Sequence, residues 1–219
     1  MRKWFSDSSL GYSLIELLVV ISVVLLLSGL TAGGIRAMRS HQVLNQAAAR
    51  LEMLLELGQA LAMSEGESVY LIIADHASEP EGVQMRAYTL IKGLSLELQH
   101  NWQFLPEKVV FAQDDSSPEV DLLGQEPLGI MESTAWEPVV GSMRILLEMT
   151  PEGTFRTGMD GEYQSASLLI ERGRWSQKGL SWEYSPQYEY EQGIPHDAVR
   201  LFFRPRTGVI QMEDKEVLP

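Results

Sequence analysis

Residues 17–35 form one uncharged, apolar stretch, and no other feature limits the possible folds of this chain as much. In a helix, which rises about 1.5 Å per residue, this stretch reaches roughly 28 Å, close to the hydrocarbon thickness of a bilayer. Only a helix crosses lipid as a single segment, because lipid offers the backbone amides no hydrogen-bond partners. Arg2 and Lys3 precede the stretch, on the side that stays in the cytoplasm. The sequence therefore predicts a transmembrane half-helix over residues 12–35.

Three interpretations of this stretch are open. The first is a cleaved secretory signal peptide, but its apolar region would have only about 7–15 residues, and Glu16 interrupts the start of the stretch. The small residues at 28–34 nevertheless offer a cleavage site. The second is an ordinary single-pass anchor. The third accounts for Gly11 and Glu16 together, because a carboxylate at the edge of an apolar helix needs a partner of opposite charge.

Gly11, the aromatic Tyr12 and then Ser-Leu-Ile-Glu-Leu-Leu-Val-Val resemble the type IV prepilin signature, which type IV pilins and type II secretion pseudopilins share. The resemblance implies that a prepilin peptidase cleaves between Gly11 and Tyr12, and that Tyr12 is then N-methylated. Most family members have Phe at this position, so Tyr12 is a mild departure that keeps the aromatic ring. The resemblance also implies that the Glu16 carboxylate pairs with the terminal amine of a neighbouring subunit in a filament.

The apolar pattern continues as an amphipathic half-helix over residues 36–64. Its expected core-facing stripe consists of Val43, Leu44, Ala47, Ala48, Leu51, Leu54, Leu55, Gly58, Leu61 and Ala62. Gly29, Gly33 and Gly34 lie near the outer end of the first half, and each glycine lowers helix stability by about 0.5–1 kcal/mol relative to Ala. These glycines predict a point of helix flexibility, with close packing between neighbouring helices as the alternative.

Residues 65–219 have the pattern of a β-rich globular domain. Gly66 suits the left-handed residue after a helix. Segments rich in β-branched and aromatic residues predict strands at 68–74, 84–91, 108–112, 144–149, 165–172, 198–204 and 208–212. The first two are expected to form one hairpin and the last two another, through a turn at 205–208. Residues 113–141 carry many Asp, Glu, Ser, Pro and Gly residues and predict an inserted excursion with a short helix.

Together these patterns predict a pilin-like α+β fold, in which one long N-terminal helix packs on an antiparallel β-sheet. The Ala/Leu-rich helix and the segments LLEMTPEGTFR, ASLLIER and RLFFRPRTGVIQ resemble the pseudopilin H/FimT-like minor pilins. Residues 94–104 are ambiguous, with Trp102 expected as their anchor. The expected organisation is a cleaved leader (1–11), the transmembrane half (12–35) and the amphipathic half (36–64) of the helix, and an extracytoplasmic domain (65–219).

The chain contains 17 Lys and Arg against 30 Asp and Glu, a formal net charge of −13, and no cysteine. The acidic balance argues against a general nucleic-acid binder, because phosphate contacts need a basic face. Without disulfides, the domain must rely on its hydrophobic core. Arg200, Arg204 and Arg206 cluster near the last hairpin, where solvated charges or pairing with a partner are favoured over a local contact with DNA.

No catalytic or metal-binding pattern stands out in the sequence. The histidines His41, His76, His100 and His196 lack ligand spacing and are interpreted as surface residues. The acidic residues Asp114, Asp115, Glu119 and Asp121 lack the EF-hand pattern, so a solvated loop is favoured over a calcium site. The Trp and Tyr residues within 173–190 are interpreted as core residues or as a contact surface for carbohydrate or protein. We therefore expect no enzymatic activity, no cofactor and no metal.

The resemblance implies a structural function, as a minor pilin or pseudopilin assembled into a type II secretion pseudopilus or a type IV pilus. The implied partners are prepilin peptidase, other pilin or pseudopilin subunits, an inner-membrane assembly platform and the lipid bilayer; nucleic acid is not expected. The implied location is the inner (cytoplasmic) membrane, crossed once, with the C-terminal domain in the periplasm. Two alternatives are a pilus component that contacts DNA or surfaces, and a membrane-anchored enzyme or carbohydrate-binding domain.

Overall fold

The chain divides into two compact units, Met1–His41 and Gln42–Pro219. The structure is a computed structural model, and it describes residues 14–76, 78, 80, 82–93, 97–99, 101–113, 119–133, 138–157, 164–178, 181–186 and 197–216.

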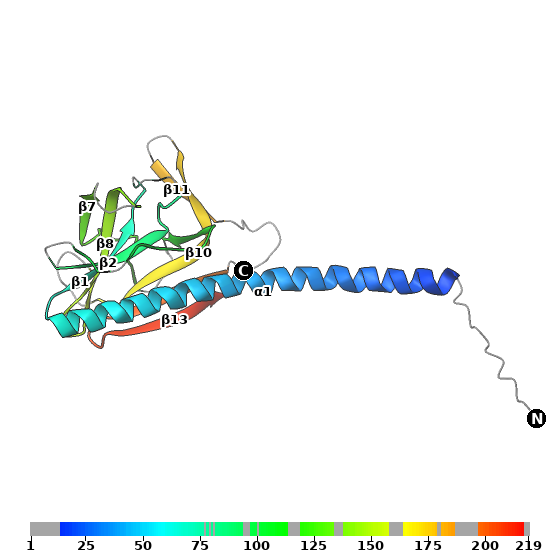
Figure 1. The fold of residues 1–219 in the computed structure, drawn as a ribbon, viewed down its shortest axis with the longest axis horizontal. Helices are drawn as coiled ribbons and strands as arrows, with labels where there is room; N and C mark the ends of the chain where they lie inside the picture. The colour runs from blue at the N-terminus through cyan, green and yellow to red at the C-terminus, as the bar shows by residue number, and fades with distance from the viewer. Residues whose placement is uncertain are drawn as a thin grey trace, which may run out of the picture. The chain divides into compact units, whose positions relative to one another are not determined.

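Helix α1 spans Leu14–Glu65 (Figure 1), where the sequence predicted a helix over residues 12–64. Gly66 has a φ of 69°, and its backbone N–H donates to the carbonyl oxygen of Ala62 at 3.0 Å. A left-handed glycine directly after the last helical residue is a common way to end a helix, because glycine has no Cβ to clash in that conformation.

The predicted membrane anchor is not supported. A helix needs about 20 consecutive apolar residues to cross a bilayer. Among the described residues, no helix is both long enough and apolar enough to do so. The expected transmembrane half over residues 12–35 is therefore corrected. The expected single-pass location in the inner membrane, with a periplasmic C-terminal domain, is wrong on the same ground, as is the description of the chain as a transmembrane prepilin.

The first sheet has seven strands in the order β3-β2-β1-β8-β7, with β4 paired to β2 and β9 paired to β8. Its strands are β1 (Val69–Ala74), β2 (Ala87–Lys92), β3 (Glu97–Leu98), β4 (Gln103–Phe104), β7 (Gly129–Ser133), β8 (Gly141–Met149) and β9 (Phe155–Arg156). All of its pairs are antiparallel. The predicted hairpin of the first two strands is confirmed, with Ile73 opposite Tyr88.

The second sheet has six strands in the order β11-β10-β12-β13, with β5 and β6 also paired to β10. Its strands are β5 (Val109–Ala112), β6 (Val120–Asp121), β10 (Ala166–Lys178), β11 (Ser181–Pro186), β12 (Asp197–Arg204) and β13 (Val209–Glu216). Among its described strands, only β6 pairs in parallel. The predicted hairpin at the end of the chain is confirmed as β12 and β13, which are longer than expected.

The expected fold class is wrong. The part of the chain after the helix is mostly β structure in two sheets, not a single antiparallel sheet with a long helix laid on it. Residues 113–141, which were predicted as an insertion, explain much of the difference between the predicted single sheet and the two sheets observed. Within this segment, β6 pairs with β10 in the second sheet, and β7 pairs with β8 at the edge of the first. Polar residues and glycines hid both strands from the sequence patterns, and no helix lies in the described part of this segment.

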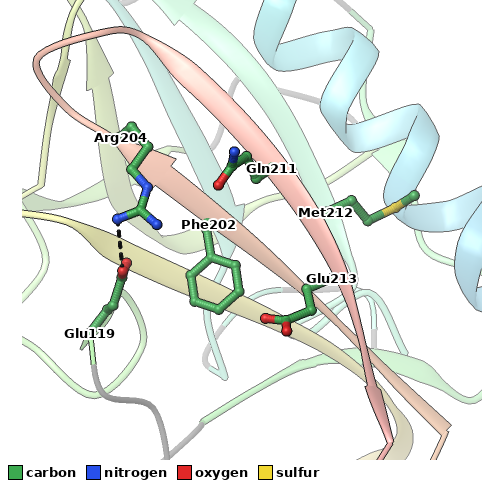
Figure 2. A pocket seen from close by; sticks show the side chains of 6 residues that line it. All are labelled: Glu119, Phe202, Arg204, Gln211, Met212 and Glu213. Atoms are coloured by element: carbon green, nitrogen blue, oxygen red, sulfur yellow. Dashed lines mark hydrogen bonds and ion pairs between the residues drawn. The ribbon is translucent and has the colours of Figure 1, made fainter.

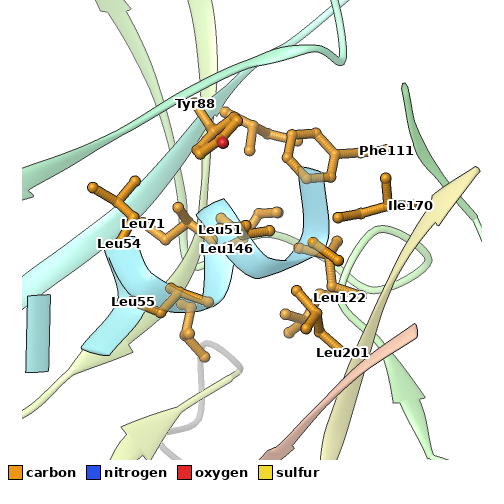
Figure 3. Close-up of a cluster of buried hydrophobic side chains, with 14 of the residues drawn as sticks. Leu51, Leu54, Leu55, Leu71, Tyr88, Phe111, Leu122, Leu146, Ile170 and Leu201 are labelled. Carbon is orange, nitrogen blue, oxygen red and sulfur yellow. The ribbon is translucent and has the colours of Figure 1, made fainter. Parts of the chain in front are cut away.

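One hydrophobic core joins both sheets to residues 42–65 of α1 (Figure 3). The buried helix residues belong to the predicted stripe: Leu44, Ala47, Ala48, Leu51, Leu54, Leu55 and Ala62. They share a cluster with Leu71 and Leu90 of the first sheet and with Ile170 and Leu201 of the second. The ring of Tyr88 meets that of Phe111 edge to face, with centroids 5.7 Å apart, so the two sheets also contact each other directly.

A second, smaller cluster contains Ile72, Ile91 and Met143 of the first sheet together with Trp102. Trp102 is only 7% exposed, which confirms its predicted anchoring role. The ambiguous residues 94–104 therefore contribute both two short strands, β3 and β4, and a buried aromatic side chain.

Candidate functional site

The first candidate surface is the apolar half-helix, residues 14–26 of α1, whose large apolar side chains are exposed among the described residues. Its large apolar side chains range from 50% exposed at Ile21 and Val23 to 82% exposed at Leu14. The Ser22 hydroxyl donates to the carbonyl oxygen of Leu18 at 2.8 Å, so this polar group has a hydrogen-bond partner within the helix. A helix that is apolar on all sides is normally buried against something else. The apolar half-helix therefore has the character of a packing surface.

The predicted processing residues fall around the start of this half-helix. Gly11 and Tyr12 lie outside the described residues, so the cleavage and N-methylation sites remain predictions. Glu16 lies exposed in the first turn of α1. A carboxylate at this position is favourable because the N-terminus of a helix carries partial positive charge. The role of Glu16 in assembly remains a prediction.

The predicted flexible point falls within the helix. The backbone of α1 is helical through Gly29, Gly33 and Gly34. The flexibility of the helix at these glycines remains a prediction.

A second apolar surface lies on the side of α1 that faces away from the core. Met53, Leu57 and Met63 are 69%, 42% and 58% exposed, respectively, and we call them the outer stripe. Met53 and Leu57 are four residues apart and therefore share one helix face. The sequence patterns did not single out these residues, although Met53 and Leu57 have the same i, i+4 spacing as the buried stripe beside them.

The third candidate surface is a groove on the β12–β13 hairpin (Figure 2). It has a volume of about 500 Å³ and is lined by Glu119, Phe202, Arg204, Gln211, Met212 and Glu213. Phe202 and Arg204 share the outward face of β12, because side chains two residues apart in a strand point the same way. Gln211 lies directly opposite Phe202 on β13. The groove thus combines an aromatic ring, an amide, a thioether and charges of both signs.

The charges at this groove are partly matched within the chain. Nη1 of Arg204 donates to Oε1 of Glu119 at 3.1 Å, which joins β12 to the segment before β6. The guanidinium carbon of Arg200 lies 5.4 Å from the centroid of the Phe202 ring, within the range of a cation–π contact. Arg200 is only 8% exposed. Two of the three arginines that the sequence analysis weighed for DNA contact are therefore engaged within the protein.

The acidic residues weighed as a calcium site do not form one in the described part of the chain. Asp114 and Asp115 lie outside it, Glu119 binds Arg204, and Oδ1 of Asp121 accepts the backbone N–H of Leu123 at 3.3 Å. Among the described residues, no group of three or more His, Asp or Glu side chains is arranged to hold a metal ion.

His76 is half-buried, so its interpretation as a surface residue is wrong. Burial lowers the pKa of its imidazole from the ordinary value of 6.5; the nearby Asp75 carboxylate opposes this shift and the Arg144 guanidinium adds to it. Nε of Arg144 donates to Oδ1 of Asp75 at 3.0 Å, and the backbone N–H of His76 donates to the same oxygen at 2.8 Å. These contacts fix the turn after β1. No imidazole of His41, His100 or His196 lies in the described part.

The aromatic residues within 173–190 fall partly on β10 and β11. Trp175 lies opposite Tyr184, and Gln177 lies opposite Trp182. Tyr188 and Tyr190 lie outside the described residues. The side chains of Trp175, Trp182 and Tyr184 also lie outside the described part, so both interpretations of these aromatic residues remain predictions.

A comparison of the chain with protein families, curated proteins and solved structures finds no match.

Proposed function

We propose that this protein is a structural subunit of a filament, of the type II secretion pseudopilus or type IV pilus kind, and that prepilin peptidase cleaves it between Gly11 and Tyr12. The observation that carries the proposal is the apolar half-helix, whose large side chains are all at least 50% exposed from Leu14 to Leu26. The segment from Gly11 to Glu16 supplies the resemblance that points to this kind of filament.

Packing of the apolar half-helix against the same helix of neighbouring subunits accounts for its composition. Full burial of one Val, Leu or Ile side chain contributes about 1.5–3 kcal/mol. With eleven such side chains exposed in residues 14–26, helix-to-helix contact gives a large driving force for assembly. The outer stripe offers three further exposed apolar side chains in the second unit. In the filament, the Glu16 carboxylate pairs with the terminal amine of the adjacent subunit and sets the register of the helices.

The first test is the mature N-terminus. The full chain is produced together with a prepilin peptidase, purified and analysed by mass spectrometry. The proposal expects a chain that begins at Tyr12 and carries one additional methyl group at its N-terminus. An intact Met1, or a chain that begins near Gly33, would contradict it.

The second test separates processing from assembly. In cells that assemble filaments of this kind, Glu16→Ala is expected to be cleaved normally and to enter sheared filaments poorly. Glu56→Ala, which removes an exposed carboxylate from the same helix, is the matched control. It is expected to enter filaments as well as the unaltered chain does. Normal incorporation of Glu16→Ala would remove Glu16 from the assembly step.

A further inference from the structure

Strand β13 is the most open sheet edge in the described part of the chain. The end strands of the two sheets are β3 and β7 in the first and β11 and β13 in the second. Strand β3 has two residues and β7 has five, while β11 has six and ends at Pro186. Strand β13 has eight residues and contains neither proline nor glycine. Native proteins usually protect an edge with short strands, bulges, prolines or charged side chains, because unpaired N–H and C=O groups can take up a further strand. Strand β13 carries charged residues only at positions 213–216, which leaves residues 209–212 as its uncharged part.

The hairpin presents this edge in a regular geometry. Strand β13 pairs with β12 over its whole length, from Arg204 opposite Val209 to Asp197 opposite Glu216, without a shift in register. In the described residues β12 is its only strand partner. Val209 and Met212, whose side chains point to opposite faces of the strand, are 44% and 42% exposed. Both faces of the edge are therefore accessible at these positions.

The side chains beside the β13 edge indicate which kind of strand could bind there. Arg204 pairs with Glu119, whereas Glu213, which lies opposite the buried Arg200 of β12, is exposed. The side chains of a strand added to β13 would lie beside Gln211 and Glu213, with the groove over Phe202 open to a long aliphatic stem (Figure 2). A Lys or Arg side chain fits both features, because its stem packs on apolar surface while its charged end reaches a carboxylate.

We propose that β13 binds an extended segment of a different protein, which adds to the second sheet as a further strand and places a basic side chain against Glu213. Main-chain hydrogen bonds supply affinity in this mode of recognition, and side chains on alternate positions supply specificity. The net charge of −13 favours a basic partner over a second copy of this chain. The proposal is independent of the filament function, since it uses neither the apolar half-helix nor the outer stripe.

The experiment measures binding of a fluorescent eight-residue peptide of alternating Thr and Val, with one central Lys, to the full chain in a nonionic detergent. We expect saturable binding and slower amide hydrogen exchange in β13, with no change in β7. A peptide with two prolines is expected not to bind, because it cannot form the ladder. Equal binding of the proline peptide, or protection elsewhere in place of β13, would overturn the proposal.

A charge exchange tests the assigned contact without disturbing the core. Glu213→Lys is expected to lower the affinity for the Lys peptide by about two- to fivefold, which is the effect of one exposed ion pair. The same variant is expected to raise the affinity for a peptide with Glu in place of Lys. Glu132→Lys, the same change on the exposed edge strand β7, is the control and is expected to leave both affinities unchanged. An equal response of the two variants, or self-association through β13 with no peptide bound, would refute the assignment.

Discussion

The side-chain amide of Gln59 donates to the carbonyl oxygen of Gly208 at 3.2 Å and to that of Gly153 at 2.6 Å. Gln59 lies on α1, Gly153 lies in the turn after β8, and Gly208 lies in the turn before β13. One amide group therefore ties the helix to a turn from each sheet. The backbone N–H of Phe155 donates to the carbonyl oxygen of Pro205 at 3.0 Å, which brings the same two turns together a second time.

Replacement of Gly208 should disturb this junction. A Cβ at this position would lie 2.1 Å from the carbonyl oxygen of Gly153 and 2.2 Å from Nε2 of Gln59, and Gly208 has a φ of +64°. Gly208→Ala therefore adds steric overlap to the backbone strain and is expected to lower the free energy of unfolding by about 2–4 kcal/mol. Urea unfolding followed by circular dichroism measures the loss.

Gly66 provides the matched control for that substitution. It has a similar φ of +69°, but no atom lies within 4 Å of its added Cβ. Gly66→Ala should therefore show only the backbone effect, about 1–2 kcal/mol. Equal losses in the two variants would show that the contacts of Gly208 with Gly153 and Gln59 do not matter for stability.

Removal of the Gln59 amide should leave two carbonyl oxygens without their side-chain donor. Gln59→Leu is expected to lower the free energy of unfolding by about 1–3 kcal/mol, the range for partly buried groups that lose a hydrogen bond. Gln46→Leu, at an exposed position on the same helix, is expected to stay within about 0.5 kcal/mol of the unaltered chain. A larger effect at Gln46 than at Gln59 would contradict the assigned contacts.

The two faces of α1 should respond differently to truncation. Leu51 is fully buried, so Leu51→Ala leaves a cavity where α1 packs on the sheets and is expected to lower the free energy of unfolding by about 2–5 kcal/mol. Met53 is 69% exposed, so Met53→Ala should change the free energy of unfolding by less than about 0.5 kcal/mol. If the outer stripe packs in a filament, Met53→Ala should instead reduce recovery of the protein in sheared filaments.

Acid should weaken the fold through His76. Burial lowers the pKa of the folded imidazole below 6.5, so the unfolded chain binds the proton more tightly than the folded chain. The contribution of His76 to stability is then complete above about pH 6.5 and declines as the pH falls from there toward the folded pKa. His76→Gln should flatten the loss of stability between about pH 7 and pH 5. An unchanged slope in urea unfolding over this range would contradict the burial of His76.

The sequence patterns located most local structure in the second unit but not its architecture. The stripe from Leu44 to Ala62 follows helical spacing, and both hairpins consist of adjacent segments, so short-range periodicity finds them. The partners of β10 cannot be found this way. It pairs with β5, β6, β11 and β12, and strands of different sheets look alike along the chain. The predicted single sheet joined segments that the structure divides between two.

The candidate surfaces were predicted unevenly for the same reason. Glu16 and the apolar stretch form one continuous motif that short-range patterns detect, but the membrane span predicted from it was wrong and the role of Glu16 remains a prediction. Glu119 and Arg204 are far apart in the sequence, and only the pairing of β6 and β12 with β10 brings their side chains together. The alternation of Arg200, Phe202 and Arg204 was a usable signal for the outward face of β12, but the sequence analysis considered only their charge.

The distant pairing of β10 has a consequence for the order in which a newly made chain acquires its structure. Strand β5 ends at Ala112, but its partner β10 begins only at Ala166. Strand β1 ends at Ala74, and its partner β8 begins only at Gly141. Leu51 and Leu55 of α1 are therefore made before the strands of both sheets that cover them. Because such long-range pairings also form slowly, the core around this helix closes only after β10 has been made.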